Sequence, residues 1–322
     1  MPESSPWDDI AIPGADFNVR QVSANTAVPC FWGRDVEGSC LFIVELDGDH
    51  MVQYRKNVVT VNGIKVDLRG GNPGQQRLVL TLDKQVDRDL FEGLCRTLAS
   101  ALGHATDSTI SSTVALAHIR RWKAFLSGRG GPRLSPEEVR GLFAELNFLL
   151  EMIDNGASVP DAVGAWLGPE RSHQDFIFGN TAVEIKALSG SERNAVRISS
   201  EDQLESLNDS LFLRLYRLSS LPDANTACSL NSLVAMVENR LDDADAVVAF
   251  DRKLAAQGYA PLPDYDELRF VVSEIRTYVV GPAFPRLIRS QLPSGVAKVA
   301  YDLELENIAP FQCGDSSVFE GF

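Results

Sequence analysis

The sequence predicts an α+β fold, and three observations lead to this prediction. Between residues 17 and 83, short runs such as CLFIVEL and RLVLTL alternate apolar and polar side chains, as strands with one buried face do. From residue 87 the apolar residues recur at helical spacing. From 136 to 219 the predicted order is helix, three strands, helix, strand. We therefore expect a β-rich N-terminal region, 1–105, followed by a second domain, 106–322.

Turn residues separate the strands expected in the N-terminal region. Asn62-Gly63 is the strongest hairpin signal, because a type I′ turn needs positive φ at both central residues. The glycine-rich run from Gly70 to Gly74 lies between two alternating stretches, and we expect it to be a turn. The chain contains no G-x-x-x-x-G-K-[ST] motif, so the sequence argues against a P-loop ATPase.

Three helices are expected next. DRDLFEGLCRTLASAL (87–102) and STVALAHIRRWKAFL (112–126) are amphipathic. In the third helix, Ser135 and Glu138 form a capping box, and the apolar side chains that follow recur at spacings of three and four. Glu145 lies at the margin of this apolar stripe.

Shorter elements complete the second domain. The residues VPDAVGAWL (159–167) predict a short helix, and Gly179-Asn180 predicts a hairpin turn. The remaining expected elements are strand AVRIS (195–199), a helix or turn from Ser200 (SEDQLESLN), strand SLFLRLYRL (210–218), helices near 229–241 and 243–257, and strands RFVVSEIRTYVV (269–280) and AKVAYDLEL (297–305).

Charge limits the classes of function. A net charge of −14 weighs against a protein that coats nucleic acid, because neutralising phosphates requires clustered Lys and Arg. A local basic cluster is nevertheless present, formed by Arg120, Arg121, Lys123, Arg129 and Arg133. This cluster could follow a DNA backbone, or it could be a solvated helix end and loop.

The cysteines and the N-terminus indicate the compartment. The five cysteines are scattered and include no C-x-x-C pair, so we expect reduced thiols rather than disulfides or a zinc knuckle. No apolar run approaches the roughly 18 residues of a membrane span, and MPESSPWDDI lacks the features of a signal peptide. We therefore expect a cytoplasmic protein with no membrane partner.

The hairpin HQDFIFGNTAVEIKALSG (173–190) carries charges where apolar side chains would stabilise it better. Counting outward from Gly179-Asn180 places Asp175 opposite Glu184, and alternation puts Lys186 on the same face. Opposed residues have Cβ atoms about 5 Å apart, and two carboxylates at that distance repel by roughly 3 kcal/mol. A divalent cation would offset this repulsion, and carboxylate oxygens are ligands that Mg²⁺ prefers. Lys186 would then orient a water molecule and stabilise charge on a phosphorus-bound oxygen.

Simpler interpretations remain open for these residues. The hairpin face could be solvated, with its acids paired with the lysine at little net gain. On the same register His173 opposes Lys186, within reach of a metal or a phosphate, but a polar residue at a strand end is the simpler interpretation. Glu145 could pair with a nearby arginine rather than lie beside a metal.

These residues resemble the motif of the PD-(D/E)XK nuclease superfamily, whose restriction-endonuclease-like core has the same order of helix, three strands, helix and strand. Glu145 matches the acid of the first helix, and Asp175 matches the aspartate of the PD pair. Glu184-Ile185-Lys186 matches the (D/E)-x-K, and Gln203 follows where some members carry a glutamine. Gln174 replaces the proline of the PD pair, a departure that is common in the superfamily.

A narrower resemblance extends over most of the chain. The segments ELNFL, WLGPERSHQDF, VEIKALSG, ISSEDQLESL, FPRL and VAYDLEL are similar to a bacterial family called PD-(D/E)XK motif proteins. Its members are commonly encoded beside DNA methyltransferase, helicase-like ATPase and GHKL-type ATPase genes in restriction-like phage-defence clusters. The resemblance implies a DNA endonuclease component of a restriction-modification type of system.

The resemblance also implies the roles of the site residues. Hydrolysis of a DNA phosphodiester would use Mg²⁺ or Mn²⁺, with Asp175, Glu184 and the Ile185 carbonyl as ligands. Glu145 would be an outer ligand or water anchor, and Lys186 would position the attacking water. The arginines expected to contact phosphates are Arg120, Arg121, Arg193, Arg197, Arg214 and Arg217.

An alternative function stays open. The chain could be a catalytically inactive DNA-binding or scaffold subunit that keeps the nuclease fold, and its acidity favours this alternative. The β-rich N-terminal region could recognise DNA, bind a partner protein or form a homodimer.

Overall fold

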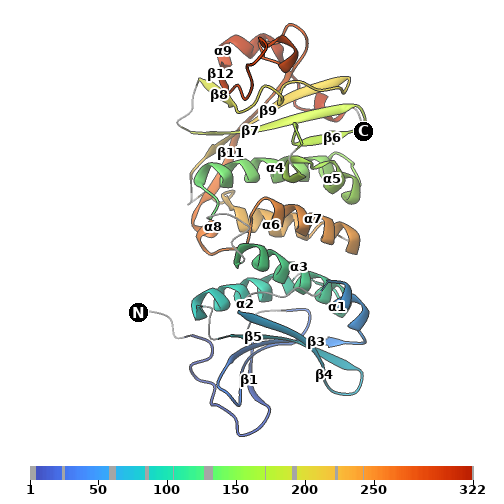
Figure 1. Cartoon of the computed structure of the whole chain (residues 1–322), viewed down its shortest axis with the longest axis vertical. Helices are drawn as coiled ribbons and strands as arrows, with labels where there is room; N and C mark the ends of the chain where they lie inside the picture. The colour runs from blue at the N-terminus through green and yellow to red at the C-terminus, as the bar shows by residue number, and fades with distance from the viewer. Residues whose placement is uncertain are drawn as a thin grey trace. The chain divides into compact units, whose positions relative to one another are not determined.

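The chain divides into two compact units in the computed structural model (Figure 1). Unit 1 comprises Met1–Arg133 and Asp242–Pro263, and unit 2 comprises Leu134–Leu241 and Asp264–Phe322. The contacts therefore divide the chain at 133 rather than near the expected boundary at 105, because helix α3 (Ser108–Leu126) packs against other helices of unit 1. The structure describes residues 5–23, 26–57, 63–83, 87–103, 105–126, 133–170, 172–190, 194–221, 224–241 and 243–320.

The described part of unit 1 contains a five-stranded antiparallel sheet with the strand order β1-β2-β3-β5-β4. Its strands are β1 (Phe17–Gln21), β2 (Cys30–Asp35), β3 (Cys40–Asp47), β4 (Ile64–Gly70) and β5 (Gln75–Leu82). The expected turn at 70–74 joins β4 to β5, as predicted. Asn62, from the other expected turn, lies outside the described residues.

Helices cover the hydrophobic side chains of unit 1. They are α1 (Met51–Asn57), α2 (Arg88–Leu102), α3 and α7 (Ala244–Ala256). The predictions for α2, α3 and α7 are confirmed, whereas α1 was not expected. On α2, Phe91 is fully buried and stacks on Trp7, with ring centroids 5.4 Å apart. The buried Arg121 of α3 donates to Asp251 of α7 at 2.6 Å, which ties the two helices together.

Unit 2 contains a six-stranded sheet with the order β10-β11-β9-β7-β6, in which β13 also pairs with β11. Strands β7 and β9 are parallel, and the other pairs of this sheet are antiparallel. The strands are β6 (Phe176–Phe178), β7 (Thr181–Ser189), β9 (Ser210–Ser219), β10 (Cys228–Ser229), β11 (Arg269–Val279) and β13 (Gln312–Cys313).

Helix α4 (Pro136–Asp154) lies along one face of this sheet (Figure 1). It begins with the predicted capping box, in which Ser135 accepts from Glu138 N. Its apolar stripe packs on the sheet, and the rings of Phe148 and Phe176 lie 4.8 Å apart. The other helices of unit 2 are α5 (Val159–Ala165), α6 (Leu230–Glu238), α8 (Asp264–Glu267) and α9 (Leu305–Ile308).

A hydrophobic cluster covers the face of the sheet opposite helix α4. It combines Leu211, Leu213 and Leu215 of β9 with side chains of β8 (Ala195–Ile198) and β12 (Tyr301–Glu304), which pair as a separate ribbon. Strand β8 therefore does not join the main sheet as a third core strand would. Residues 201–204 form turns, which is one of the two alternatives expected from Ser200, so the second helix of the predicted core order is not formed there.

The described helices include none that is long and apolar enough to cross a lipid bilayer.

Candidate functional site

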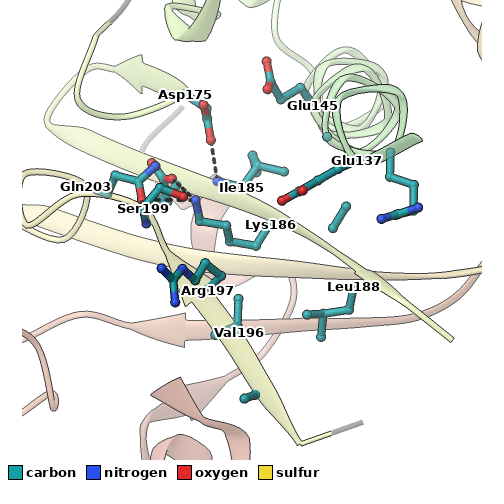
Figure 2. A pocket seen from close by; sticks show the side chains of 15 residues that line it. Glu137, Glu145, Asp175, Ile185, Lys186, Leu188, Val196, Arg197, Ser199 and Gln203 are labelled. Carbon is teal, nitrogen blue, oxygen red and sulfur yellow. Dashed lines mark hydrogen bonds and ion pairs between the residues drawn. The ribbon is translucent and has the colours of Figure 1, made fainter. Parts of the chain in front are cut away.

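The predicted hairpin register is confirmed over Phe176–Phe178. Phe176 pairs with Val183 and Phe178 with Thr181, so the chain reverses at Gly179-Asn180, where Gly179 has a φ of 50°. The β6 ladder ends at Phe176, which leaves the following part of β7 open along this edge. Asp175 lies one residue before β6, and its Oδ2 accepts a hydrogen bond from Ile185 N at 2.8 Å across that edge (Figure 2).

The segment before the hairpin fixes Asp175. The main-chain oxygen of Asp175 accepts from Leu167 N at 2.7 Å and from Gly168 N at 3.0 Å. A Cβ on Gly168 would lie 3.0 Å from both Asp175 Oδ1 and Glu145 Oε2. A larger residue at this position would therefore push the two carboxylates out of place.

Helix α4 supplies a further carboxylate beside Asp175. Glu145 extends from α4 on the same side as Asp175 (Figure 2), and its Oε2 accepts from the Trp166 indole at 2.7 Å. Trp166 is fully buried and forms an isolated bridge with Phe176, so the indole donor has a fixed position.

Strand β7 positions Glu184 and Lys186 on one face. Glu184 is only 1% exposed, and its Oε1 lies 2.9 Å from Lys186 Nζ. Its other oxygen, Oε2, is buried and has no hydrogen-bond partner among the described residues. Lys186 Nζ also donates to Gln203 Oε1 at 3.2 Å, and Gln203 Oε1 accepts from Ser199 N at 2.8 Å (Figure 2).

These side chains line one cavity of about 270 Å³. The lining residues are Glu137, Arg140, Gly141, Glu145, Asp175, Glu184, Ile185, Lys186, Ala187, Leu188, Ala195, Val196, Arg197, Ser199 and Gln203. The structure thus brings together Glu145, Asp175, the Glu184-Ile185-Lys186 run and Gln203, which the sequence had singled out.

Burial dominates the electrostatics of the cavity. Desolvation, followed by repulsion from Asp175, raises the pKa of Glu184 to about 8, although Lys186 acts in the opposite direction. Burial and the Asp175 charge raise the pKa of Glu145 well above its usual value, and burial also raises that of Asp175. Burial alone would lower the pKa of Lys186, but Glu184, Asp175 and Glu145 together raise it. The carboxyl groups therefore lack sufficient positive charge around them.

The donor set fits a hard divalent cation. Asp175 and Glu184 offer carboxylate oxygens, and Glu184 Oε2 is already desolvated without a partner. In a strand, the N–H and C=O of one residue point to the same side, so the Ile185 carbonyl faces the edge where its N–H meets Asp175. Within the described part of the chain, no group of three or more His, Cys, Asp or Glu side chains is arranged to hold a metal. The groups that would hold the cation are therefore the carboxylates of Asp175 and Glu184 and the main-chain carbonyl of Ile185.

His173 does not join the cavity lining. Its side chain is 70% exposed, and its Nδ1 lies 3.9 Å from Asp202 Oδ2. The expected position opposite Lys186 is therefore wrong, because the ladder ends at Phe176 and the chain diverges before it.

Several arginines expected to contact phosphates are held by acids instead. Arg121 is buried against Asp251, and Arg120 lies 3.5 Å from the same carboxylate. Arg214 is buried, with its NH2 group 2.5 Å from Glu151 Oε2. Arg121 and Arg214 are thus structural, which corrects their predicted role.

The other arginines have different environments. Arg217 pairs with Glu274 at 2.9 Å. Arg197 lines the cavity and is 60% exposed, with an ion pair to Asp302 at 3.2 Å, so its predicted phosphate contact remains a prediction. Arg129 and Arg193 lie outside the described residues.

The sequence interpretation missed part of the site. Trp166 and Gly168 hold the carboxylates, and Arg140 and Gly141 line the cavity. The sequence did contain a signal for Gly141, because residues 137, 141 and 145 are spaced by four, which places Gly141 on the same helix face as Glu145. No local signal marks Trp166, since its partner Glu145 is 21 residues away.

The comparisons with known proteins agree with this geometry. Residues 4–306 match a family model whose description is "Putative PD-(D/E)XK family member, (DUF4420)". No curated protein and no solved structure matches the chain significantly. The match covers nearly the whole sequence, so the resemblance inferred from the motif residues is confirmed.

Proposed function

This chain belongs to the DUF4420 family, and we propose that it is a metal-dependent DNA endonuclease of the PD-(D/E)XK type. The observation that carries the proposal is the unpartnered, buried Glu184 Oε2 in a cavity shared with Asp175 and Lys186. A buried carboxylate oxygen without a donor is costly, and a cation would offset that cost.

The residues have distinct roles in this proposal. Asp175, Glu184 and the Ile185 carbonyl would hold Mg²⁺ or Mn²⁺. A bound divalent ion supplies Lewis-acid stabilisation of charge at a phosphate. Lys186, steered by Gln203 at 3.2 Å, orients the attacking water, and Glu145, fixed by Trp166, anchors water beside it.

A cleavage assay tests the proposal. Supercoiled plasmid is incubated with Mg²⁺ or Mn²⁺ and either the wild type, Asp175→Ala or Lys186→Ala. We expect the wild type to nick or linearise the plasmid and both variants to lose at least a hundredfold in rate. Asp154→Ala is the matched control, because Asp154 is an exposed acid of the same unit that pairs with Arg240. Equal cleavage by all four proteins would contradict the assigned roles.

One observation favours a second candidate, a non-catalytic DNA-binding or scaffold subunit. Lys186 already neutralises Glu184 through a 2.9 Å ion pair, so the fold has a charge partner without any metal. Such a subunit would bind DNA without cutting it, and its DNA binding would be the same in EDTA as in Mg²⁺. A mobility-shift assay under both conditions distinguishes the two candidates.

The biological setting forms part of the proposal. From the sequence resemblance, we propose that the protein acts in the cytoplasm within a restriction-like phage-defence system that includes methyltransferase, helicase-like and GHKL-type ATPase partners. Phage plating efficiency on cells that carry the intact gene cluster, compared with cells in which this chain has Lys186→Ala, tests this setting.

A further inference from the structure

Arg140 of α4 lines the carboxylate cavity, and among the described residues it has no direct ion pair. Lys186 pairs with Glu184 and Arg197 with Asp302, but among the described residues no ion pair or hydrogen bond joins the Arg140 side chain to another group. Glu137 lies one turn earlier on the helix, and the described structure contains no ion pair between the two.

The position of Arg140 on the helix gives it no stabilising role. Arg140 is the fifth residue of α4, just after the first turn, where the helix dipole disfavours a cation. Its side chain is half-buried, so part of its hydration has been lost without a protein partner. Neither local helix stability nor packing against an acid accounts for an arginine here.

Gly141, the next residue, also lines the cavity and has no side chain to fill it. A glycine inside a helix destabilises it relative to alanine. A Cβ built on Gly141 meets no protein atom within 4 Å. The protein itself therefore does not require glycine at this cavity-lining position.

We propose that Arg140 and Gly141 form a subsite for a backbone phosphate of the substrate nucleic acid, beside the carboxylate pocket. The guanidinium donates a fork of N–H groups that matches two phosphate oxygens, and the missing side chain at Gly141 lets the backbone approach the helix. The subsite depends on the proposed function for the identity of the substrate, because a nucleic acid would present one phosphate to the carboxylate pocket and a neighbouring phosphate to α4.

The test measures DNA binding and thermal stability separately. Fluorescence anisotropy with a labelled DNA duplex is recorded in Ca²⁺ over a series of salt concentrations, and Tm is measured on the same proteins. The variants are Arg140→Ala and Gly141→Ala. Their matched controls are Arg240→Ala, an exposed arginine of unit 2 outside the cavity, and Gly164→Ala, a helical glycine outside the cavity whose Cβ also meets no atom.

The subsite predicts opposite effects on stability and binding at the glycine. Gly141→Ala should raise Tm by about 2–4 °C, as Gly164→Ala should, yet only Gly141→Ala should weaken DNA binding, by about tenfold. Arg140→Ala should weaken binding by about ten- to a hundredfold and reduce the slope of log K against log salt by about one. Arg240→Ala should leave both quantities near their wild-type values.

The outcomes separate this proposal from the nuclease function. If the wild type cuts DNA while Arg140→Ala and Gly141→Ala bind like the wild type, the subsite is wrong and the nuclease function stands. If the wild type binds DNA without cutting it and both variants lose affinity, the subsite stands and the nuclease function is wrong. If the wild type binds no DNA at all, the subsite is overturned together with its substrate.

Discussion

Replacement of Glu184 by glutamine should change how stability depends on pH. Glu184 is 1% exposed, and its pKa is raised from 4.5 to about 8, chiefly by burial. Between pH 4.5 and 8 the folded protein therefore holds a proton that the unfolded chain releases, so the free energy of unfolding falls as the pH rises. A pKa change of this size corresponds to about 5 kcal/mol, which is fully lost above pH 8.

The assay must follow the unfolding of unit 2, so its probe has to lie within that unit. Divalent metal must be absent during the measurement. Trp166 is the tryptophan that the sequence places in unit 2, so 5-fluorotryptophan labelling and ¹⁹F NMR during urea unfolding in EDTA report on this unit. We expect the unfolding free energy of the wild type to fall by several kcal/mol between pH 5 and pH 8, and that of Glu184→Gln to fall less, because the raised pKa values of Glu145 and Asp175 still contribute in the variant.

Saturating Mn²⁺ provides a second comparison. Because the ion stabilises the ionised carboxylates, its addition at pH 8 should restore the stability of the wild type but not that of Glu184→Gln. An identical pH slope in the two proteins in EDTA would refute the argument that Glu184 is buried without adequate compensation.

Three further substitutions test the residues that hold the site. Gly168→Ala should weaken Mn²⁺ binding by about tenfold in a calorimetric titration, because the added Cβ would lie 3.0 Å from two carboxylates. Trp166→Phe removes the donor that lowers the pKa of Glu145, so the pH profile of DNA cleavage should move to higher pH. Arg214→Met removes the ion-pair partner of Glu151, which among the described residues keeps only the hydrogen bond from Tyr216, and should destabilise the protein to urea by about 3 kcal/mol, whereas Arg214→Met with Glu151→Met should recover part of that loss.

Local signals predicted most elements of the fold. The capping box at Ser135 and the strand expected at 210–218 have signals within the element itself, and both elements form where expected, the strand as Ser210–Ser219. The segment from Ser200 was predicted as a helix or a turn, and it forms turns at 201–204, where the side chain of Gln174 from a distant segment donates to three of its carbonyls. Tertiary contacts of this kind leave no recognisable pattern in the neighbouring sequence.

The same distinction applies to the candidate site. Hairpin register follows from the turn and the period of two, so the proximity of Asp175 to strand β7 was predictable. The indole that holds Glu145 and the buried acid that holds Arg121 depend on long-range packing, so no pattern near either residue predicts them. The overestimate of phosphate-binding arginines has the same cause, because the sequence does not distinguish a buried ion pair from a free cation.

The most direct measurement is a calorimetric titration of Mn²⁺ into the wild type and Asp175→Asn. The account predicts saturable binding by the wild type that strengthens as the pH rises toward 8, because Glu184 must release its proton, and at least tenfold weaker binding by Asp175→Asn. Absence of Mn²⁺ binding to the wild type, or equal affinity in the two proteins, would contradict the claim that Asp175 and Glu184 hold a divalent ion.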